Sequence, residues 1–139
     1  SKKSLLSLLE TFHAMKDQRF IIQPYIAHAK EWRLFIVKGK ILACIEKSLN
    51  PDDFRGNAKR SMGKNQKKIS REIEEIVLMA FLRSGLDYAG IDLLESSSGE
   101  LLLLEINPVP GFEQAEKLSK INIARELLLA LGSCESALH

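Results

Sequence analysis

The spacing of apolar positions predicts a helix and a β-hairpin in the first third of the chain. Near the N-terminus, apolar residues recur at intervals of three and four, which predicts an amphipathic helix with an apolar face of Leu5, Leu8, Leu9 and Phe12. Residues 19–26 are short and apolar, and Pro24 limits them to an edge strand or a strand end. Two further apolar runs within residues 32–47 flank Lys38-Gly39, which predicts a hairpin turning there.

A third segment carries the start and stop signals of a helix. Ser70 is a suitable N-cap, and acidic residues follow it in the first turns. The helix is expected to continue to about Ser84, where Gly85 provides the C-terminal stop.

The C-terminal third repeats the alternation of strands and helices. A second hairpin turns around Ser98-Gly99, an irregular loop covers residues 107–111, and a final helix covers residues 121–131 and ends at Gly132. Hairpins mixed with helices in this order favour an α+β fold, with an antiparallel sheet and flanking helices.

Composition is that of an ordinary globular domain. The 139 residues are 45% hydrophobic and 27% charged, and the net charge of +2 provides no field for nucleic acid or membrane, so we expect neither as a partner. Cys44 and Cys134 lie far apart and outside any metal-ligand spacing, which indicates a reduced, cytoplasmic protein. No apolar run is long enough for a membrane span. By length we expect the chain, residues 1–139, to be a single domain or a piece of a larger one.

Two acids stand in the second hairpin where burial makes charge costly. If Ser98-Gly99 are the central residues of the turn, Asp92 lies directly opposite Glu105. Asn107 follows Glu105 by two positions and so points to the same face, whereas Ile91, Leu93, Leu104 and Ile106 point to the other. Carboxylate and amide oxygens on one face suit Mg²⁺ (or Mn²⁺). The alternative is that both acids mark the wet end of a half-buried hairpin and pair with nearby lysines.

A basic segment strengthens the metal interpretation. Residues 50–69 are polar and predict a long loop, and between residues 55 and 71 this region holds basic side chains and no acid. Glycines and asparagines between them leave backbone N–H groups able to face an anion. Phosphate held between this loop and a metal explains both features, which makes a nucleoside triphosphate the expected ligand. Solvated surface and RNA binding are the alternatives, and the latter lacks aromatic stacking residues.

Five motifs in order resemble the ATP-grasp ligases, and most closely the branch of the RimK ribosomal-protein glutamate ligase. They are QPYI, EWRLFIV, DFRGNAKR, YAGIDLL and LLEINPVPGFE, and the match around them runs from about Phe20 to Leu131. The resemblance implies an α+β fold with ATP between two subdomains. It also implies ATP-dependent carboxylate–amine ligation through an acyl phosphate.

The resemblance assigns roles to individual residues. Adenine and ribose would be held by Gln23, Pro24, Tyr25, Ile26 and Glu31. The phosphates and the transferring group would be contacted by Arg33, Arg55, Gly56, Asn57 and Arg60, with Arg33, Arg55 and Asn57 as the catalytic set. The metal ligands would be Asp92, Glu105 and Asn107, and the substrate loop would contain Pro110, Gly111 and Glu113.

The chain departs from the family pattern at its beginning. Too few residues precede Gln23 to hold the two ATP-binding lysines, the glycine-rich phosphate loop and the preceding α/β domain of the family. We therefore expect the chain to be the C-terminal part of a ligase, with little or no turnover alone. NPVPG and KRSMG also differ from the family's NSSPG and HRGG, which leaves the acceptor open.

The partners expected from the resemblance are ATP, an amino acid such as glutamate, and a carboxylate substrate on a protein tail or a small molecule. A homo-oligomer stays open. The alternative function is a non-catalytic nucleotide-binding or assembly module of the same fold.

Overall fold

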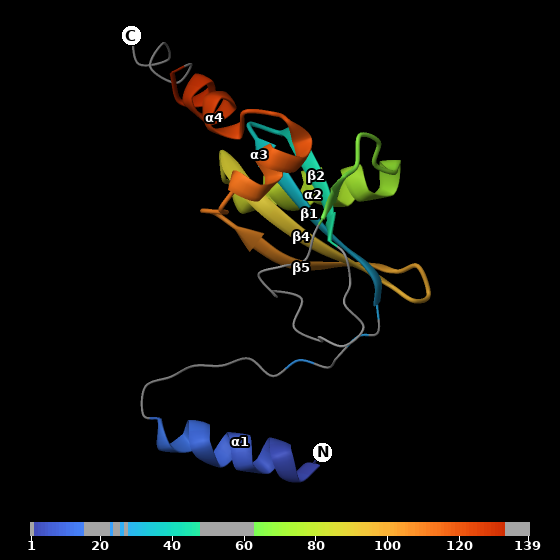
Figure 1. Cartoon of the computed structure of the whole chain (residues 1–139), viewed down its shortest axis with the longest axis vertical. Coiled ribbons are helices and arrows are strands. Elements are labelled where there is room, and N and C mark those ends of the chain that lie inside the picture. Colours follow the sequence, from blue (N-terminus) through green and yellow to red (C-terminus); the bar gives the residue numbers. More distant parts are fainter. Residues whose placement is uncertain (1, 16–22, 24–25, 27, 48–62, 133–139) are drawn as a thin grey trace.

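The computed structural model describes residues 2–15, 23, 26, 28–47 and 63–132. Its elements, in chain order, are α1 (Lys2–Ala14), β1 (His28–Val37), β2 (Lys40–Lys47), β3 (Lys64–Asn65), α2 (Arg71–Ser84), β4 (Tyr88–Ser96), β5 (Leu101–Asn107), α3 (Glu113–Ser119) and α4 (Ile123–Gly132). They form an α+β fold, as expected from the sequence (Figure 1).

The strands form one antiparallel sheet in the order β3-β2-β1-β4-β5. The hairpin between β1 and β2 turns at Lys38-Gly39, where both residues have positive φ, as a two-residue type I′ turn requires. This confirms the predicted turn. The central strand β1 pairs with β4, which comes much later in the chain. Residues of these two distant segments therefore lie side by side.

Alternate residues of the sheet pack against helices on opposite faces. The even-numbered residues of β1, such as Leu34 and Ile36, join α2 in one core with Ile91 and Leu93 of β4. On the other face, Phe35 and Val37 pack with residues of α3 and α4. Helices α3 and α4 cover only one end of this second face. The other end carries the charged residues described below.

Helix α2 matches its expected bounds closely. Ser70 Oγ accepts a hydrogen bond from the Ile73 amide, and Gly85 closes the helix in the left-handed conformation. Ile73, Val77 and Phe81 recur on the face that meets the sheet. The start, the end and the buried face of this helix are thus all encoded locally.

Several expectations about the remaining segments were incomplete or wrong. The short strand β3 and helix α3 were not predicted, so Glu113 begins a helix instead of lying in a loop. The final helix starts at Ile123, where Asn122 Oδ1 accepts a hydrogen bond from the Arg125 amide. Gln23 and Ile26 lie outside helices and strands, and most of the strand expected over residues 19–26 lies outside the described residues.

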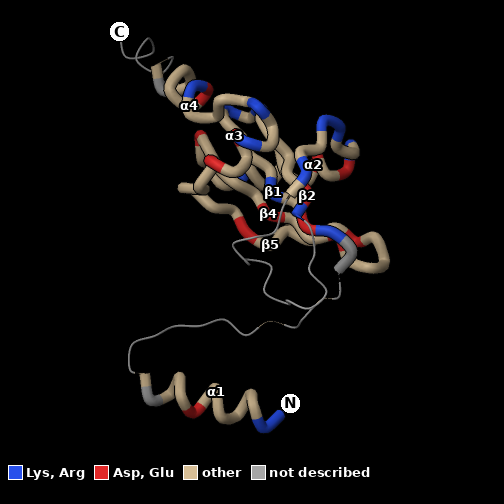
Figure 2. Tube along the Cα trace, in the orientation of Figure 1, with Lys and Arg blue, Asp and Glu red and all other residues tan. Residues whose placement is uncertain are grey.

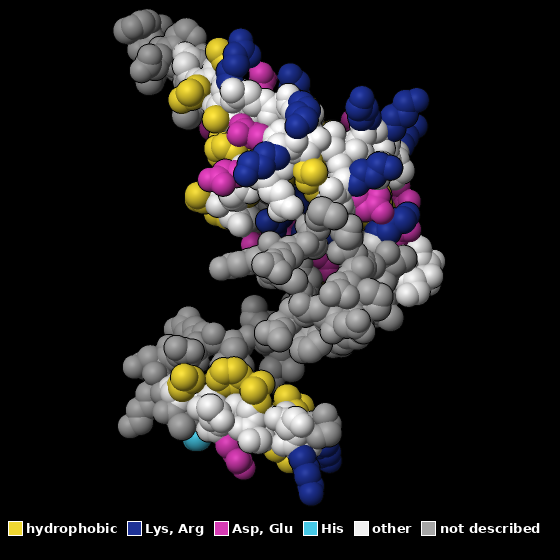
Figure 3. All heavy atoms as spheres, viewed as in Figure 1, with side chains coloured by type: hydrophobic (Ala, Val, Ile, Leu, Met, Phe, Trp, Pro, Cys, Tyr) yellow, Lys and Arg dark blue, Asp and Glu magenta, His cyan; other side chains and the backbone are white. Residues whose placement is uncertain are grey.

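Helix α1 confirms the first predicted helix but not a buried apolar face. Figure 1 shows α1 apart from the sheet, and Figure 2 shows basic residues at its start and one acidic position further along. Leu5, Leu6 and Leu8 are about half exposed, and Figure 3 shows hydrophobic side chains in a row along the helix. Its apolar residues therefore do not contribute to either core of the sheet.

Candidate functional site

The predicted opposition of Asp92 and Glu105 is confirmed. The ladder between β4 and β5 pairs Asp92 with Glu105 and Gly90 with Asn107. Since residues two apart on a strand share a face, Asn107 lies on the same face as the two acids. The three residues expected to bind metal therefore share one face of one hairpin.

The turn that produces this register is longer than the sequence predicted. Ser96 N donates to Glu100 O, so the turn contains three residues, 97–99, instead of the two central residues expected. A β-bulge between β4 and β5 at Leu104 then restores the pairing at Asp92. The bulge also leaves Leu104 about half exposed, so the expectation that it points into a core was wrong.

Arg33 forms the closest contact of the site. The pairing of β1 with β4 places Arg33 directly opposite Asp92. Arg33 Nε donates to Asp92 Oδ1 at 2.7 Å, and Arg33 Nη2 donates to Oδ2 at 2.6 Å. This bidentate pair fixes the guanidinium plane against a carboxylate that is only 6% exposed.

Lys47 links the same carboxylate to a second buried acid. Its Nζ lies 3.2 Å from Asp92 Oδ2 and 3.4 Å from Glu31 Oε2. Glu31 is buried, and Lys47 lies opposite it in the ladder of β1 and β2. Acidic and basic groups thus alternate across three adjacent strands.

The surroundings keep Asp92 ionised. Burial alone would raise its pKa, but the hydrogen bonds from Arg33 and the positive charge of Lys47 outweigh burial and hold the pKa of this carboxyl below its usual range. The same hydrogen bond raises the pKa of Arg33 above its already high value, against the opposing effect of burial. Asp92 is therefore a permanent anion at neutral pH.

The donor set of this face fits a hard divalent cation. Within the described ranges no three histidine, cysteine or acidic side chains gather in a metal-binding group. The set here contains two carboxylates, and the amide oxygen of Asn107 completes it. Carboxylate and amide oxygens are the donors that Mg²⁺ prefers. Glu105 is exposed, whereas Asn107 Oδ1 accepts a hydrogen bond from the Val109 amide at 2.9 Å, which orients the amide group.

The loop after β5 is fixed to the same hairpin. Tyr88 Oη donates to Pro110 O at 3.2 Å, and Pro110 is buried against Gly90. A Cβ at Gly90 would lie 2.7 Å from the Pro110 Cβ, so only glycine permits this approach. Burial raises the pKa of Tyr88 to about 12, with a further contribution from Glu116, so the hydroxyl stays a donor. Gly111 and Glu113 follow and are exposed.

Of the remaining predicted residues, the structure describes only Gln23 and Ile26. Both are exposed. The predicted residues that lie outside the described ranges are Pro24, Tyr25, Arg55, Gly56, Asn57 and Arg60.

Sequence reasoning missed Lys47 altogether. A two-residue turn at Lys38-Gly39 with regular pairing would place Glu46, not Lys47, opposite Glu31. An irregularity in the ladder next to Phe35 shifts the register by one and turns Lys47 toward the site. The local sequence contains no pattern that predicts this shift in register.

None of the helices that the structure describes is both long and apolar enough to cross a membrane.

Comparison with known proteins agrees with the fold. The model of the RimK-like ATP-grasp domain matches residues 1–131. The probable alpha-L-glutamate ligase of Histophilus somni is 33% identical over 131 residues, which are 93% of this chain and 43% of that protein. The chain thus spans less than half the length of this curated relative.

Two solved structures share the fold. The D-alanine–D-alanine ligase from Bacillus anthracis, complexed with ATP, has a TM-score of 0.57 and 24% identity over 94% of this chain and 45% of its own. The ATP-grasp ligase PsnB, complexed with a precursor variant, Mg and ADP, has a TM-score of 0.63 and 18% identity over 78% of this chain and 33% of its own. With the family model covering nearly the whole chain, this protein belongs to the RimK-like ATP-grasp family.

Proposed function

We propose that this chain carries the metal and phosphate site of an ATP-dependent carboxylate–amine ligase. One observation carries the proposal: Asp92 and Glu105 oppose each other on the sheet face where Arg33 and Lys47 also converge. Two acids side by side destabilise a sheet unless a cation lies near them. A face that combines hard oxygen donors with two cationic side chains suits a metal–phosphate complex.

The names of similar proteins support the reaction class. The Histophilus somni relative is named a probable alpha-L-glutamate ligase, and the Bacillus anthracis protein is a D-alanine–D-alanine ligase. Both names describe amide formation between a carboxylate and an amine. Glutamate as the amine, and a protein tail or a small molecule as the carboxylate, are the substrates we propose for this chain.

The chemistry proceeds in two balanced steps. A carboxylate oxygen of the substrate attacks the γ-phosphorus, and the bond from phosphorus to the bridging oxygen breaks, which gives an acyl phosphate and ADP. The amine nitrogen then attacks the acyl carbon, loses a proton, and expels inorganic phosphate. Neither step needs a side-chain nucleophile, so positioning and charge carry the catalysis.

Asp92, Glu105 and Asn107 would hold Mg²⁺, which when bound neutralises part of the phosphate charge. Arg33 is oriented by its two bonds to Asp92, and its Nη1, which bonds to no other residue that the structure describes, would meet a phosphoryl oxygen. Lys47 holds Asp92 and Glu31 at fixed positions and adds a second positive charge to this face. These residues bind and orient the anions between which the phosphoryl group moves.

The other assignments complete the proposal. Arg55, Gly56, Asn57 and Arg60 would contact the phosphates from their loop. Adenine and ribose would be contacted by Gln23, Pro24, Tyr25, Ile26 and Glu31. Pro110, Gly111 and Glu113 would line the side where the acceptor enters.

Binding of Mn²⁺ in the presence of ADP tests the proposal, because Mn²⁺ takes the same hard oxygen ligands and its free form has a strong paramagnetic resonance signal. The wild-type chain with ADP is expected to reduce the free signal, and Asp92→Asn is expected to leave it nearly unchanged. Glu95→Gln is the matched control, since Glu95 lies on β4 but pairs with Lys30 on the opposite face. Equal Mn²⁺ binding by wild type and Asp92→Asn would refute the metal assignment.

A further inference from the structure

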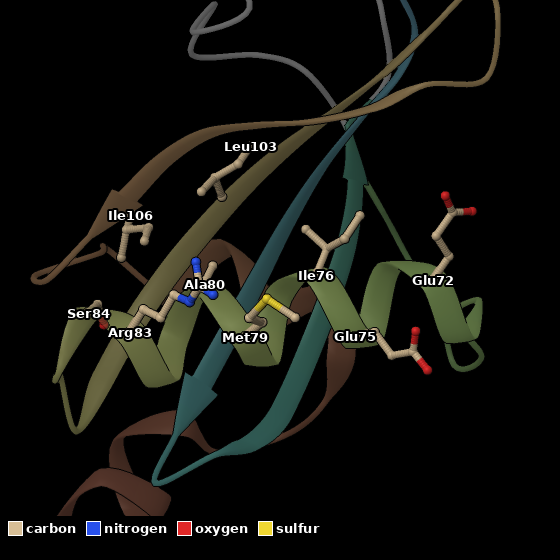
Figure 4. Close-up of a pocket in the computed structure, with 9 residues that line it drawn as sticks. All are labelled: Glu72, Glu75, Ile76, Met79, Ala80, Arg83, Ser84, Leu103 and Ile106. Atoms are coloured by element: carbon tan, nitrogen blue, oxygen red, sulfur yellow. The ribbon is translucent and has the colours of Figure 1, made fainter.

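The two faces of the sheet differ in how their charges are arranged. On the face that packs against α2, an apolar groove of about 620 Å³ lies between this helix and β5, with charged residues of α2 at its ends (Figure 4). On the opposite face, acidic and basic side chains contact one another directly. Lys47 contacts two buried acids there, Asp92 and Glu31.

The two cations that contact Asp92 are held differently. Arg33 donates two short hydrogen bonds, of 2.6 and 2.7 Å, in the bidentate geometry that a planar guanidinium favours. Lys47 Nζ forms one longer contact with Asp92, of 3.2 Å, and it shares Oδ2 with Arg33 Nη2. A carboxylate oxygen has two lone pairs, so these two cations together fill Oδ2. The contact of Lys47 is therefore the weaker one and the easier to exchange.

A divalent cation on Asp92 would compete with Lys47. An ammonium group this close to a carboxylate repels a metal ion bound to the same group, and burial strengthens the repulsion because little water screens it. Arg33 cannot move away without breaking both of its bonds. Lys47 has a flexible four-carbon stem and a second acidic partner, Glu31, at 3.4 Å. Lys47 is thus the cation that a metal ion would displace.

We infer that Lys47 is an exchangeable counter-ion of Asp92. It neutralises the buried carboxylate until a metal ion binds there, and then leaves Asp92 but stays near Glu31, where its ammonium group becomes available to a phosphate oxygen. The buried acid thus has a positive partner at every stage, and metal binding prepares the site for phosphate. This inference rests on the proposed function, because it requires Asp92 to bind the metal.

Amine labelling of the wild-type chain, followed by mass spectrometry, tests the exchange. With a chelator present, Lys47 is expected to react slowly, because its side chain is only 14% exposed and lies between two acids. Saturating Mn²⁺ should raise this rate at least about threefold, since labelling follows the fraction of molecules in which Lys47 has left Asp92. ADP added to the metal-bound chain should lower the rate again. Lys30 pairs with Glu95 on the other face and should react equally in all three samples.

Titrations of Lys47→Met provide a second measurement. Without the competing ammonium group, this variant is expected to bind Mn²⁺ alone at least about fivefold more tightly than wild type. At saturating Mn²⁺, it is expected to bind ADP at least about fivefold less tightly, because the phosphates lose a cationic partner. Lys30→Met removes the same charge from the other face and should match wild type in both titrations.

The possible failures are distinguishable. Equal labelling of Lys47 with and without Mn²⁺, in a wild-type chain that binds the metal, would overturn the exchange and leave the proposed metal site standing. Weaker binding of Mn²⁺ by a folded Lys47→Met variant would also overturn it, because that result describes a lysine that only holds the acids in place. If the wild-type chain binds no Mn²⁺ even with ADP, the proposed metal site fails, and the exchange fails with it.

Discussion

Asp92 is the residue on which most of the described site converges. It receives two hydrogen bonds from Arg33, lies near Lys47, and faces Glu105 across the ladder. Burying an ionised carboxylate without partners destabilises a fold, and ion pairs and hydrogen bonds offset that cost. Its ionisation therefore couples the stability of the fold to the chemistry of the site.

The lowered pKa of Asp92 predicts a specific dependence of stability on pH. Because the folded-state pKa lies below the unfolded value of about 3.9, the stability that the carboxylate adds is complete above that value and is lost as the pH falls through the folded-state pKa. Asp92→Asn should lower the free energy of unfolding by about 3 kcal/mol at neutral pH. Below about pH 4 the free energies of unfolding of the variant and the wild type should approach each other, because the wild-type carboxylate becomes protonated there. Urea unfolding followed by Trp32 fluorescence between pH 3 and 7 measures it. A difference that does not narrow on acidification would argue against this role of Asp92.

Lys47 is expected to stabilise the two buried acids. Lys47→Met keeps the apolar stem but leaves Glu31 and Asp92 without this cation, which should lower the free energy of unfolding by about 1–3 kcal/mol. It should also raise the pH at which Asp92 becomes protonated, since the Lys47 charge lowers that pKa. Lys40→Met removes only an exposed partner of Glu126 and should change stability by less than about 0.5 kcal/mol. Equal effects of the two variants would contradict the role of Lys47.

At the scale of residues, sequence reasoning found the acids but not their partners. Asp92, Glu105 and Asn107 could be placed on one face because they belong to one hairpin. The contact of Arg33 with Asp92 depends on the pairing of β1 with β4. These strands are far apart in the sequence, and no local sequence pattern predicts that they pair.

Among the elements, the hairpin of β4 and β5 and the loop after it hold the site together. Gly90 lies opposite Asn107 in the ladder and in contact with Pro110. One small residue therefore positions both a proposed metal ligand and the proposed substrate loop.

Gly90→Ala is expected to separate the loop from the hairpin. The added methyl group would overlap the Pro110 ring, and the resulting shift should cost about 1–3 kcal/mol of stability and weaken binding of Mg²⁺-nucleotide. Gly111→Ala is the matched control in the same loop, because a Cβ there meets nothing within 4 Å. Thermal unfolding measures the stability of both variants, and titration with nucleotide measures their affinity for Mg²⁺-nucleotide. Equal behaviour of the two alanine variants would show that the close approach at Gly90 is unimportant.

Elements with strong local signals were predicted well, and those that depend on packing were not. Helix α2 has a cap, a stop and a periodic apolar face, and its bounds followed from the sequence. The bulge at Leu104 and the shift next to Phe35 were invisible, because a ladder irregularity reflects how whole strands fit the sheet. Helix α3 was missed because its seven residues carry few apolar positions.

For the whole molecule, the sheet separates two surfaces with different chemistry. One face carries the alternating charges of the proposed ligase site, and the other carries α2 and the apolar groove. The fold class and the family followed from the order of motifs along the chain. The groove was not foreseen, since it depends on how α2 lies beside the edge strand β5.

Titration calorimetry with ATP, in the presence of Mg²⁺ and in the presence of a chelator, tests whether Asp92 and Glu105 bind the metal that carries the phosphates. We expect wild type and Glu95→Gln to bind ATP with Mg²⁺. The affinity should fall at least about tenfold without the metal or in Asp92→Asn and Glu105→Gln, because each change removes a contact between the phosphates and this face. Equal ATP affinity in all four proteins, with and without Mg²⁺, would contradict it.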